Sequence, residues 1–211
     1  MKVVAFNGSP RKEGNTYHSL MLVGAELERE NIDFEIIHVG NKMIRGCLAC
    51  GMCRQNKNER CVINDEVNDW IQCMKNADGI ILGSPVHYSG IASTMKSFLD
   101  RAFYVATGGS NNLLRHKVGA SVVAVRRSGG VPTFDGLNHY INYAEMIMPG
   151  SNYWNVAHGT APGEVSQDEE GQQVMRILGK NMAWLLKVLA AGKSQVEPVP
   201  PEQKKFTNFI R

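Results

Sequence analysis

The chain begins with the run Lys2-Val-Val-Ala-Phe-Asn7, which continues directly into Gly8-Ser-Pro-Arg-Lys-Glu-Gly-Asn-Thr16. The first run is short and apolar without polar alternation, which is typical of a strand buried on both faces of a parallel sheet. A helical pattern follows over 16–30. A loop between such a strand and helix offers backbone N–H groups and the positive end of the helix dipole. This opening therefore predicts a parallel α/β sheet with an anion site after its first strand.

The same strand–helix alternation continues through most of the chain. Further strands are predicted at 34–39, 79–83, 118–125 and 147–155, with helices at 65–76, 91–105, 133–145 and 168–191. Parallel strands joined by helices require right-handed crossovers. We therefore expect an α/β fold with a flavodoxin-like, doubly wound, five-stranded parallel sheet in the strand order 2-1-3-4-5.

Length and composition suit one such domain followed by a tail. The chain has 211 residues, of which 43% are hydrophobic and 20% charged, so a full core is available. We expect the domain to cover 1–192, with a cysteine-rich loop at 46–62. The tail over 193–211 contains three prolines, and it is either a solvated terminus or an oligomerisation arm that docks through Phe206 and Phe209.

Charge and hydropathy exclude two classes of partner. The net charge is only +3, and the lysines and arginines are scattered, which argues against nucleic acid. No apolar run reaches the roughly 18 residues of a membrane-spanning helix, and the first apolar run is too short for the core of a secretory signal. We therefore expect a cytoplasmic protein without a membrane partner.

Four of the five cysteines follow the pattern Cys47-x2-Cys50-x2-Cys53-x7-Cys61. This spacing favours a [4Fe–4S] cluster, because each iron takes a thiolate and ferredoxin-type runs use two-residue gaps. Zinc sites usually combine cysteine pairs separated by about a dozen residues or more. Disulfides are not expected in a reducing compartment. A set of reduced, unligated thiols is the remaining alternative.

Three loops follow strands at the edge of the sheet where ligands of open α/β folds bind. Loop 8–16 combines hydroxyls, an amide and the Arg11 fork with a helix N-terminus, which suits a single terminal phosphate. The loop has neither a dinucleotide-binding nor a Walker pattern. The alternative is a helix cap formed by Asn15 or Thr16, with Arg11 in solvent.

The other two loops have compositions suited to a flat ligand. Loop 83–90 reads Gly-Ser-Pro-Val-His-Tyr-Ser-Gly, in which glycines allow close backbone approach and His87 and Tyr88 would stack on or edge a ring. Loop 126–130 reads Arg-Arg-Ser-Gly-Gly, which would hold an electron-rich carbonyl group. A solvated strand end is the alternative for the two arginines.

These loops carry a family resemblance. Gly8-Ser-Pro-Arg11 with Asn15-Thr16, and Gly83-Ser-Pro-Val-His-Tyr88 with Met95-Lys-Ser-Phe-Leu-Asp-Arg101, resemble the NADPH-dependent FMN reductase family of flavodoxin-like proteins. The cysteine run, followed by Val62-Ile-Asn-Asp-Glu66, resembles the iron–sulfur flavoprotein branch of that family. The resemblance extends over residues 1 to about 130.

The resemblance implies cofactors and the residues that bind them. FMN would bind through its phosphate to Ser9, Arg11, Lys12, Asn15 and Thr16, through its ring to Pro85, Val86, His87, Tyr88 and Gly90, and through its pyrimidine edge to Arg127, Ser128, Gly129 and Gly130. A [4Fe–4S] cluster close to the flavin would bind to Cys47, Cys50, Cys53 and Cys61. No side chain is expected to be catalytic, because the flavin performs the chemistry.

Three functions remain open from the sequence. The first is an FMN-dependent oxidoreductase that takes electrons from NAD(P)H, as co-substrate, and passes them to a small-molecule acceptor. The second is an electron carrier that uses the cluster and FMN between a ferredoxin-type donor and an acceptor. The third is a metal- or redox-sensing binding module without turnover.

The segment 146–154 bears on the oligomeric state. It combines methionines with Tyr153 and Trp154, which a monomer would leave exposed near the flavin. Interfaces favour aromatic and methionine side chains. We therefore expect a homodimer or homotetramer; the alternative is that Tyr153 and Trp154 complete the core.

Overall fold

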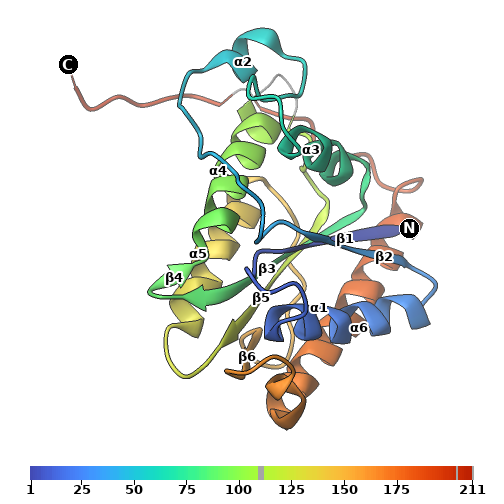
Figure 1. Cartoon of the computed structure of the whole chain (residues 1–211). Helices are drawn as coiled ribbons and strands as arrows, with labels where there is room; N and C mark the ends of the chain where they lie inside the picture. Colours follow the sequence, from blue (N-terminus) through green and yellow to red (C-terminus); the bar gives the residue numbers. More distant parts are fainter. Residues whose placement is uncertain (109–111, 203, 211) are drawn as a thin grey trace.

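A parallel sheet passes through the middle of the molecule, with helices on both faces (Figure 1). The computed structural model describes residues 1–108, 112–202 and 204–210. The sheet has the order β2-β1-β3-β5-β6, formed by β1 (Lys2–Asn7), β2 (Asp33–His38), β3 (Gly79–His87), β5 (Val118–Val125) and β6 (Val156–His158). All of these strands pair in parallel, which confirms the predicted flavodoxin-like order. The two-residue strand β4 (Gly90–Ile91) folds back antiparallel on the end of β3.

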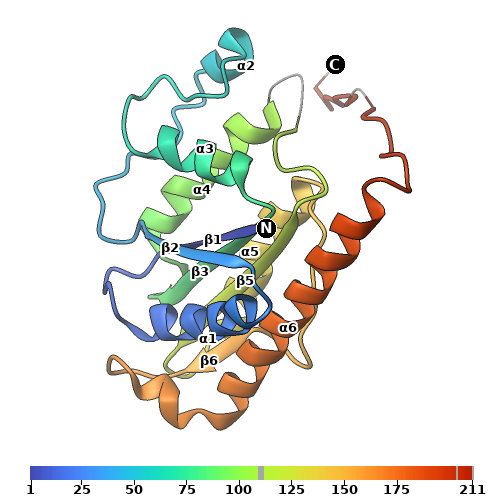
Figure 2. The ribbon, with the colours of Figure 1, turned by 90° about the vertical axis from the view of Figure 1, so that its right-hand side faces the viewer.

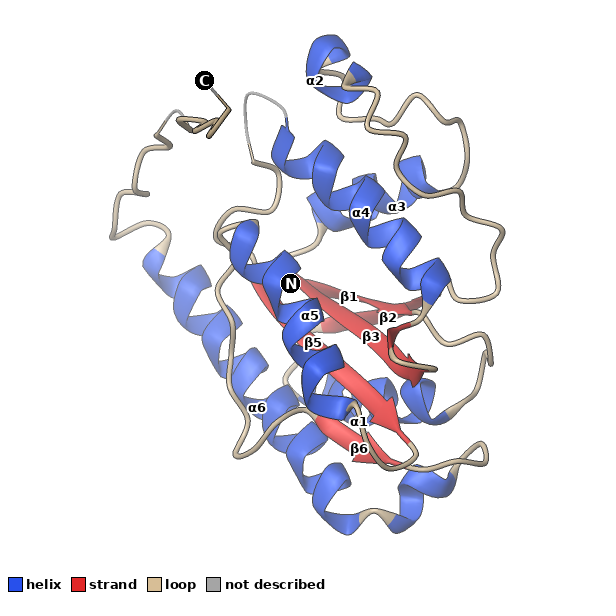
Figure 3. Ribbon diagram, turned by 90° about the vertical axis from the view of Figure 1, so that its left-hand side faces the viewer, coloured by secondary structure: helices blue, strands red, loops and turns tan. Residues whose placement is uncertain are grey.

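Alternate residues of the central strands supply two separate cores. On one face, Val3 and Ala5 pack with α1 (Asn15–Arg29) and α6 (Glu169–Gly192). On the other, Val4 and Phe6 pack with α3 (Val67–Asn76), α4 (Ser93–Gly108) and α5 (Gly130–Tyr143). Figures 2 and 3 show these two helix layers on either side of the sheet. Burial on both faces explains why the strands read as continuous apolar runs.

Close packing between α1 and α6 depends on a glycine. A Cβ atom at Gly179 would lie 2.7 Å from the carbonyl oxygen of Val23 and 2.8 Å from Cβ of Glu26. Gly192, at the end of the same helix, has no such neighbour within 4 Å. The absence of a side chain at Gly179 therefore sets how closely α6 approaches the helix that follows β1.

Three local features differ from the sequence prediction. The fifth strand is not 147–155: Ile147 makes one isolated bridge to Val118, and the ladder with β5 begins only at Val156. Pro149, which lacks an N–H group, interrupts the intervening pairing. β3 continues to His87, so loop 83–90 is mostly strand. A short helix, α2 (Met52–Asn56), lies within the cysteine-rich segment and was not predicted.

The tail and the helices give two further results. Val199 and Lys204 of the tail contact the same chain, since Arg115 donates to the carbonyl of Val199 and Lys204 bonds to the Tyr143 hydroxyl. None of the helices in the described residues is both long and apolar enough to cross a bilayer.

Replacing Gly179 with alanine should lower the free energy of unfolding by about 1–3 kcal/mol, because the added methyl group overpacks the α1–α6 contact. Gly192→Ala is the matched control on the same helix, and it should cause no loss because its surroundings are open and alanine favours helix. Urea unfolding of both variants measures the difference. Equal stability of the two variants would contradict the packing account.

Candidate functional site

A cavity of about 240 Å³ opens at the carboxyl edge of the sheet, where the strand order reverses between β1 and β3. We call it the edge cavity. Its lining residues are Ser9, Pro10, Arg11, Gly14, Asn15, Thr16, Pro85, Val86, His87, Ala124, Val125, Arg126, Gly159 and Thr160. Parallel pairing has thus brought loop 8–16 together with residues that follow or end three other strands.

The start of α1 leaves backbone donors available at this cavity. The N-cap residue is Gly14, and no side chain caps the helix. The first N–H groups of a helix have no acceptor within it. The N–H groups of Asn15 and Thr16 therefore lie at the cavity wall without a side-chain cap. The alternative in which Asn15 or Thr16 caps the helix is excluded, because the N-cap residue is Gly14.

Thr16 adds a buried donor to the same wall. Its side chain is 1% exposed, and its Oγ1 has no hydrogen-bond partner among the residues that the structure describes. A buried hydroxyl without a partner costs about 1–3 kcal/mol. An anion oxygen in the edge cavity would accept from this hydroxyl, so the residues present fit a phosphate group.

Asn15 lines the edge cavity, and its side chain also anchors a neighbouring segment. Its Nδ2 donates to the carbonyl of Ala161 at 2.9 Å, and its Oδ1 accepts from the N–H of Val165 at 3.3 Å. Arg11 likewise donates from Nη1 to the carbonyl of Thr160 at 3.0 Å. Both side chains thereby hold the segment after β6 against loop 8–16, and this places Thr160 in the cavity wall.

Residues in and just after β2 contact loop 8–16 and hold it in place. His38 shares a hydrogen bond of 2.7 Å from Nε2 to the carbonyl oxygen of Ser9. A Cβ atom at Gly40 would lie only 2.0 Å from that same oxygen. Ser9 Oγ accepts from the N–H of Arg11 at 3.1 Å, which closes the turn. The loop is therefore held in shape by the protein alone.

The second and third loops meet at Val86. A Cβ atom at Gly129 would lie 3.1 Å from Cγ1 of Val86, and Gly129 has a φ of +90°, which favours glycine. Beyond Val86, Tyr88 has a φ of 60° and is fully exposed. A left-handed, solvent-facing tyrosine is uncommon, and such strain clusters at ligand and partner sites.

The structure brings together only part of the predicted flavin site. Lys12, Tyr88, Gly90, Arg127, Ser128, Gly129 and Gly130 do not line the edge cavity, although Gly129 packs beside it. Arg126, the first residue of the third loop, lines it instead of Arg127. Gly159 and Thr160 were missed because the fifth strand was placed too early; residues after the true β6 end at the same edge.

The four clustered cysteines line a second, separate hollow of about 20 Å³, which we call the cysteine hollow. All five cysteines are free thiols, so no disulfide forms. Burial raises the pKa of the Cys53 thiol. Within the described ranges, no group of three or more His, Cys, Asp or Glu residues is placed to hold a metal ion. This hollow is small for a cubane cluster.

Arg101 of α4 closes the cysteine loop at both ends. Its guanidinium is completely buried and forms a bidentate pair with Asp65, at 2.6 and 2.8 Å. It also donates to the carbonyls of Arg45 and Ile63, each at 3.3 Å. These contacts lie just before the first cysteine of the loop and just after the last, so Arg101 holds the two ends of the cysteine loop in place.

The Nε nitrogen of Arg101 differs from its two Nη nitrogens, which are both hydrogen-bonded. Nε is buried and has no hydrogen-bond acceptor in the part of the chain that the structure describes, and Arg101 lines the cysteine hollow together with Cys61. Sulfur ligands accept hydrogen bonds that tune iron–sulfur centres. The thiol donor set and this unused donor therefore fit a cluster chemically, although the hollow is too small as it stands.

The edge cavity and the cysteine hollow lie at different levels of α4. They share no lining residue. The edge cavity includes Val86, whose partner Ile91 lies just before the start of α4 at Ser93, whereas Tyr104 of the same helix lines the hollow. Eleven helical residues correspond to roughly 16 Å. Within one chain, the edge cavity and the cysteine hollow are therefore separate sites, and the closeness of cluster and flavin stays a prediction.

The doubly wound sheet, with its polar loop after β1 and a cavity at the switch point, defines a flavodoxin-like protein. The chain belongs to the NADPH-dependent FMN reductase family, whose sequence model matches residues 1–161. An iron–sulfur flavoprotein of Methanocaldococcus jannaschii is 35% identical over 196 residues, which cover 90% of this chain and 99% of the relative. These matches support a flavin-dependent oxidoreductase.

Solved structures agree on the fold. RosB, described with bound 8-demethyl-8-formylriboflavin-5′-phosphate, has a TM-score of 0.71 at 16% identity, covering 100% of this chain and 94% of RosB. A flavodoxin from the domain Archaea has a TM-score of 0.58 at 17% identity, covering 89% and 99%.

Replacing Arg101 with leucine should lower the free energy of unfolding by about 3–5 kcal/mol, because Asp65 loses its buried partner. It should also speed alkylation of Cys61, because Arg101 no longer holds the end of the cysteine loop. The control, Lys75→Met, removes the Lys75–Glu59 pair of 2.6 Å, whose side chains are 41% and 37% exposed, and should cost less than about 1 kcal/mol. Urea unfolding and mass-spectrometric alkylation rates measure both effects. Similar losses in the two variants would contradict the role of Arg101.

Proposed function

We propose that this chain binds FMN in the edge cavity and acts as an NAD(P)H-dependent flavin oxidoreductase. The observation that carries the proposal is the buried, unpartnered hydroxyl of Thr16 beside the open N-terminus of α1. Three donors converge there on one space, and an FMN phosphate would accept from all of them. Membership of the FMN reductase family supports the same ligand.

The residues that line the edge cavity, and those of the three loops beside it, each have a task in this proposal. Arg11, Ser9 and Lys12 would bind the phosphate with the N–H groups of Asn15 and Thr16. Residues 85–88 and Gly90 would orient the ring, and 126–130 would contact its pyrimidine edge. When bound, FMN supplies the transfer of electrons from NAD(P)H to an acceptor. The chain's own contribution is to anchor the phosphate, hold the ring and restrict water.

Thr16→Val should distinguish the contribution of the FMN phosphate to binding from that of the rest of the ligand. The variant removes an unsatisfied buried hydroxyl, so the apo-protein should gain about 1 kcal/mol of unfolding free energy. FMN affinity should fall about tenfold or more, because a hydrogen bond to a charged group contributes about 1.5–3 kcal/mol. Affinity for riboflavin, which lacks the phosphate, should not change. Isothermal titration with both ligands makes the measurement.

Thr133→Val is the control for stability. Thr133 is also 1% exposed, but its hydroxyl donates to the carbonyl of Gly129 at 2.9 Å, so its loss should destabilise the apo-protein. If Thr16→Val weakened riboflavin and FMN equally, or neither, the phosphate assignment would be wrong.

The cysteine hollow favours a second function, that of an electron carrier. We propose that Cys47, Cys50, Cys53 and Cys61 bind a [4Fe–4S] cluster that receives electrons from a ferredoxin-type donor. The supporting observations are that all four cysteines line one hollow and that the Nε–H of Arg101 is unused beside Cys61. Relatives that are named iron–sulfur flavoproteins support an iron–sulfur cofactor.

Cys50→Ser should lower the iron and sulfide content of anaerobically reconstituted protein and leave FMN bound. Cys73→Ser should leave both cofactors in place, because Cys73 lies in α3 and outside the hollow. Iron and sulfide assays, with the visible spectrum, distinguish the two variants. Wild-type protein without iron or sulfide after reconstitution would overturn the cluster and leave the flavin proposal intact.

We also propose that the chain forms a homodimer or homotetramer. Tyr88 is fully exposed, and Tyr153 and Trp154 are 60% and 44% exposed, so they do not complete the core. Exposed aromatic groups of this kind are typical of interfaces. Sedimentation at micromolar concentration is the test, and a monomer would refute the assembly.

A further inference from the structure

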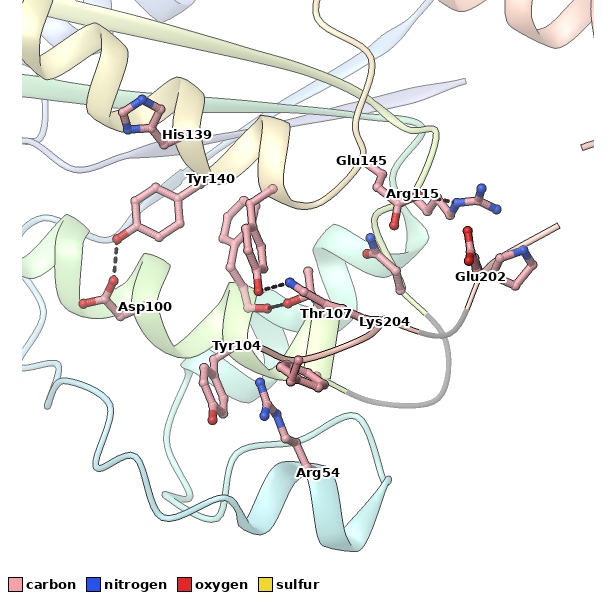
Figure 4. Close-up of a pocket in the computed structure, with 16 residues that line it drawn as sticks. Arg54, Asp100, Tyr104, Thr107, Arg115, His139, Tyr140, Glu145, Glu202 and Lys204 are labelled. Carbon is pink, nitrogen blue, oxygen red and sulfur yellow. Dashed lines mark hydrogen bonds and ion pairs between the residues drawn. The ribbon is translucent and has the colours of Figure 1, made fainter. Parts of the chain in front are cut away.

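A third and much larger cavity lies on the α4–α5 side of the molecule, where the tail passes (Figure 4). Its volume is about 910 Å³, which falls within the usual size of small-molecule sites. We call it the aromatic cavity, because Phe103, Tyr104, Tyr140, Tyr143 and Phe206 all line it. It shares no lining residue with the edge cavity.

Much of the polar lining is already paired. The hydroxyl of Tyr140 donates to Asp100, and burial raises the pKa of Tyr140 to about 12, so this hydroxyl keeps its proton. Arg115 donates to Glu145 at 2.6 Å and to the carbonyl of Val199 at 2.6 Å. These groups shape the cavity and offer little to a ligand.

Two cationic side chains, Arg54 and Lys204, line the cavity beside its aromatic rings, and the carboxylates in the lining are Asp100, Glu145 and Glu202. The Arg54 guanidinium lies 4.5 Å from the ring centre of Tyr104 and 5.8 Å from that of Phe206. Its side chain makes no hydrogen bond or ion pair to any residue in the described ranges. Lys204 lies 3.9 Å from the ring centre of Tyr143 and bonds only to that tyrosine's hydroxyl there. Figure 4 shows Arg54 beside Tyr104.

We propose that the aromatic cavity binds a planar aromatic molecule that carries an anionic group such as a carboxylate, sulfonate or phosphate. Tyr143 and Phe206, which are 61% and 74% exposed, provide stacking surfaces, and the guanidinium of Arg54 has a fork free for an anion. Because Tyr104 lines both this cavity and the cysteine hollow, a ligand here would sit next to the cysteines. The cavity itself shares no lining residue with the edge cavity, and only the experiment below uses the FMN binding of the proposed function.

The probe is 2-naphthalenesulfonate, titrated into full-length protein saturated with FMN so that the edge cavity is occupied. Two comparison ligands separate the requirements: 2-naphthol lacks the anion, and hexanesulfonate lacks the ring. Isothermal titration should show binding of the probe and affinities lower by about tenfold or more for each comparison ligand.

Arg54→Met should weaken the probe by a similar factor while binding of 2-naphthol stays unchanged. Arg176→Met is the matched control, because Arg176 is an arginine on α6 outside the cavity, and it should have no effect. The proposal is overturned if the probe does not bind, if Arg54→Met leaves its affinity unchanged, or if hexanesulfonate binds equally well. It is also overturned if the probe dissociates an oligomer in sedimentation, since a second copy would then occupy the cavity.

Discussion

Parallel pairing of β1 with β2 and β3, and of β3 with β5, is the constraint on which the rest of the structure depends. It forces the chain to leave every strand at the same edge, so residues from loop 8–16, from the end of β3 and from the end of β5 meet although they are far apart in sequence. The chain then adds Thr160 from beyond β6 through the side chains of Arg11 and Asn15. The edge cavity is thus a consequence of sheet topology, and the glycines and hydrogen bonds of the loops determine its shape.

The hydrogen-bond pairing of buried side-chain atoms links this architecture to function. In the described residues, two buried side-chain atoms lack a partner, Thr16 Oγ1 and Arg101 Nε. Native proteins pair nearly all such atoms, so each exception calls for an explanation. One lies in the wall of the edge cavity and the other belongs to a residue of the cysteine hollow. The two ligands proposed above, FMN and an iron–sulfur cluster, would each supply the missing acceptor.

The sequence predicted the fold and part of the lining of the edge cavity, because those signals are local. Apolar runs mark strands buried on both faces, and polar loops directly after them mark the ligand edge. The fifth strand was misplaced because 147–155 has apolar content but also Pro149, and only three residues of β6 pair. Two roles were not predicted: Arg101 closes the cysteine loop, and Asn15 anchors the segment after β6. Both depend on contacts across 36 to 150 residues, which no local pattern reveals.

The most direct test of the account is the visible spectrum of protein purified without oxygen, followed by acid extraction of any released flavin. The account predicts flavin absorption bands from FMN, with a broader shoulder that oxygen bleaches when the cluster is lost. A colourless protein that cannot be reconstituted with FMN would contradict it, because the unpartnered donor of Thr16 would then have no ligand to satisfy it.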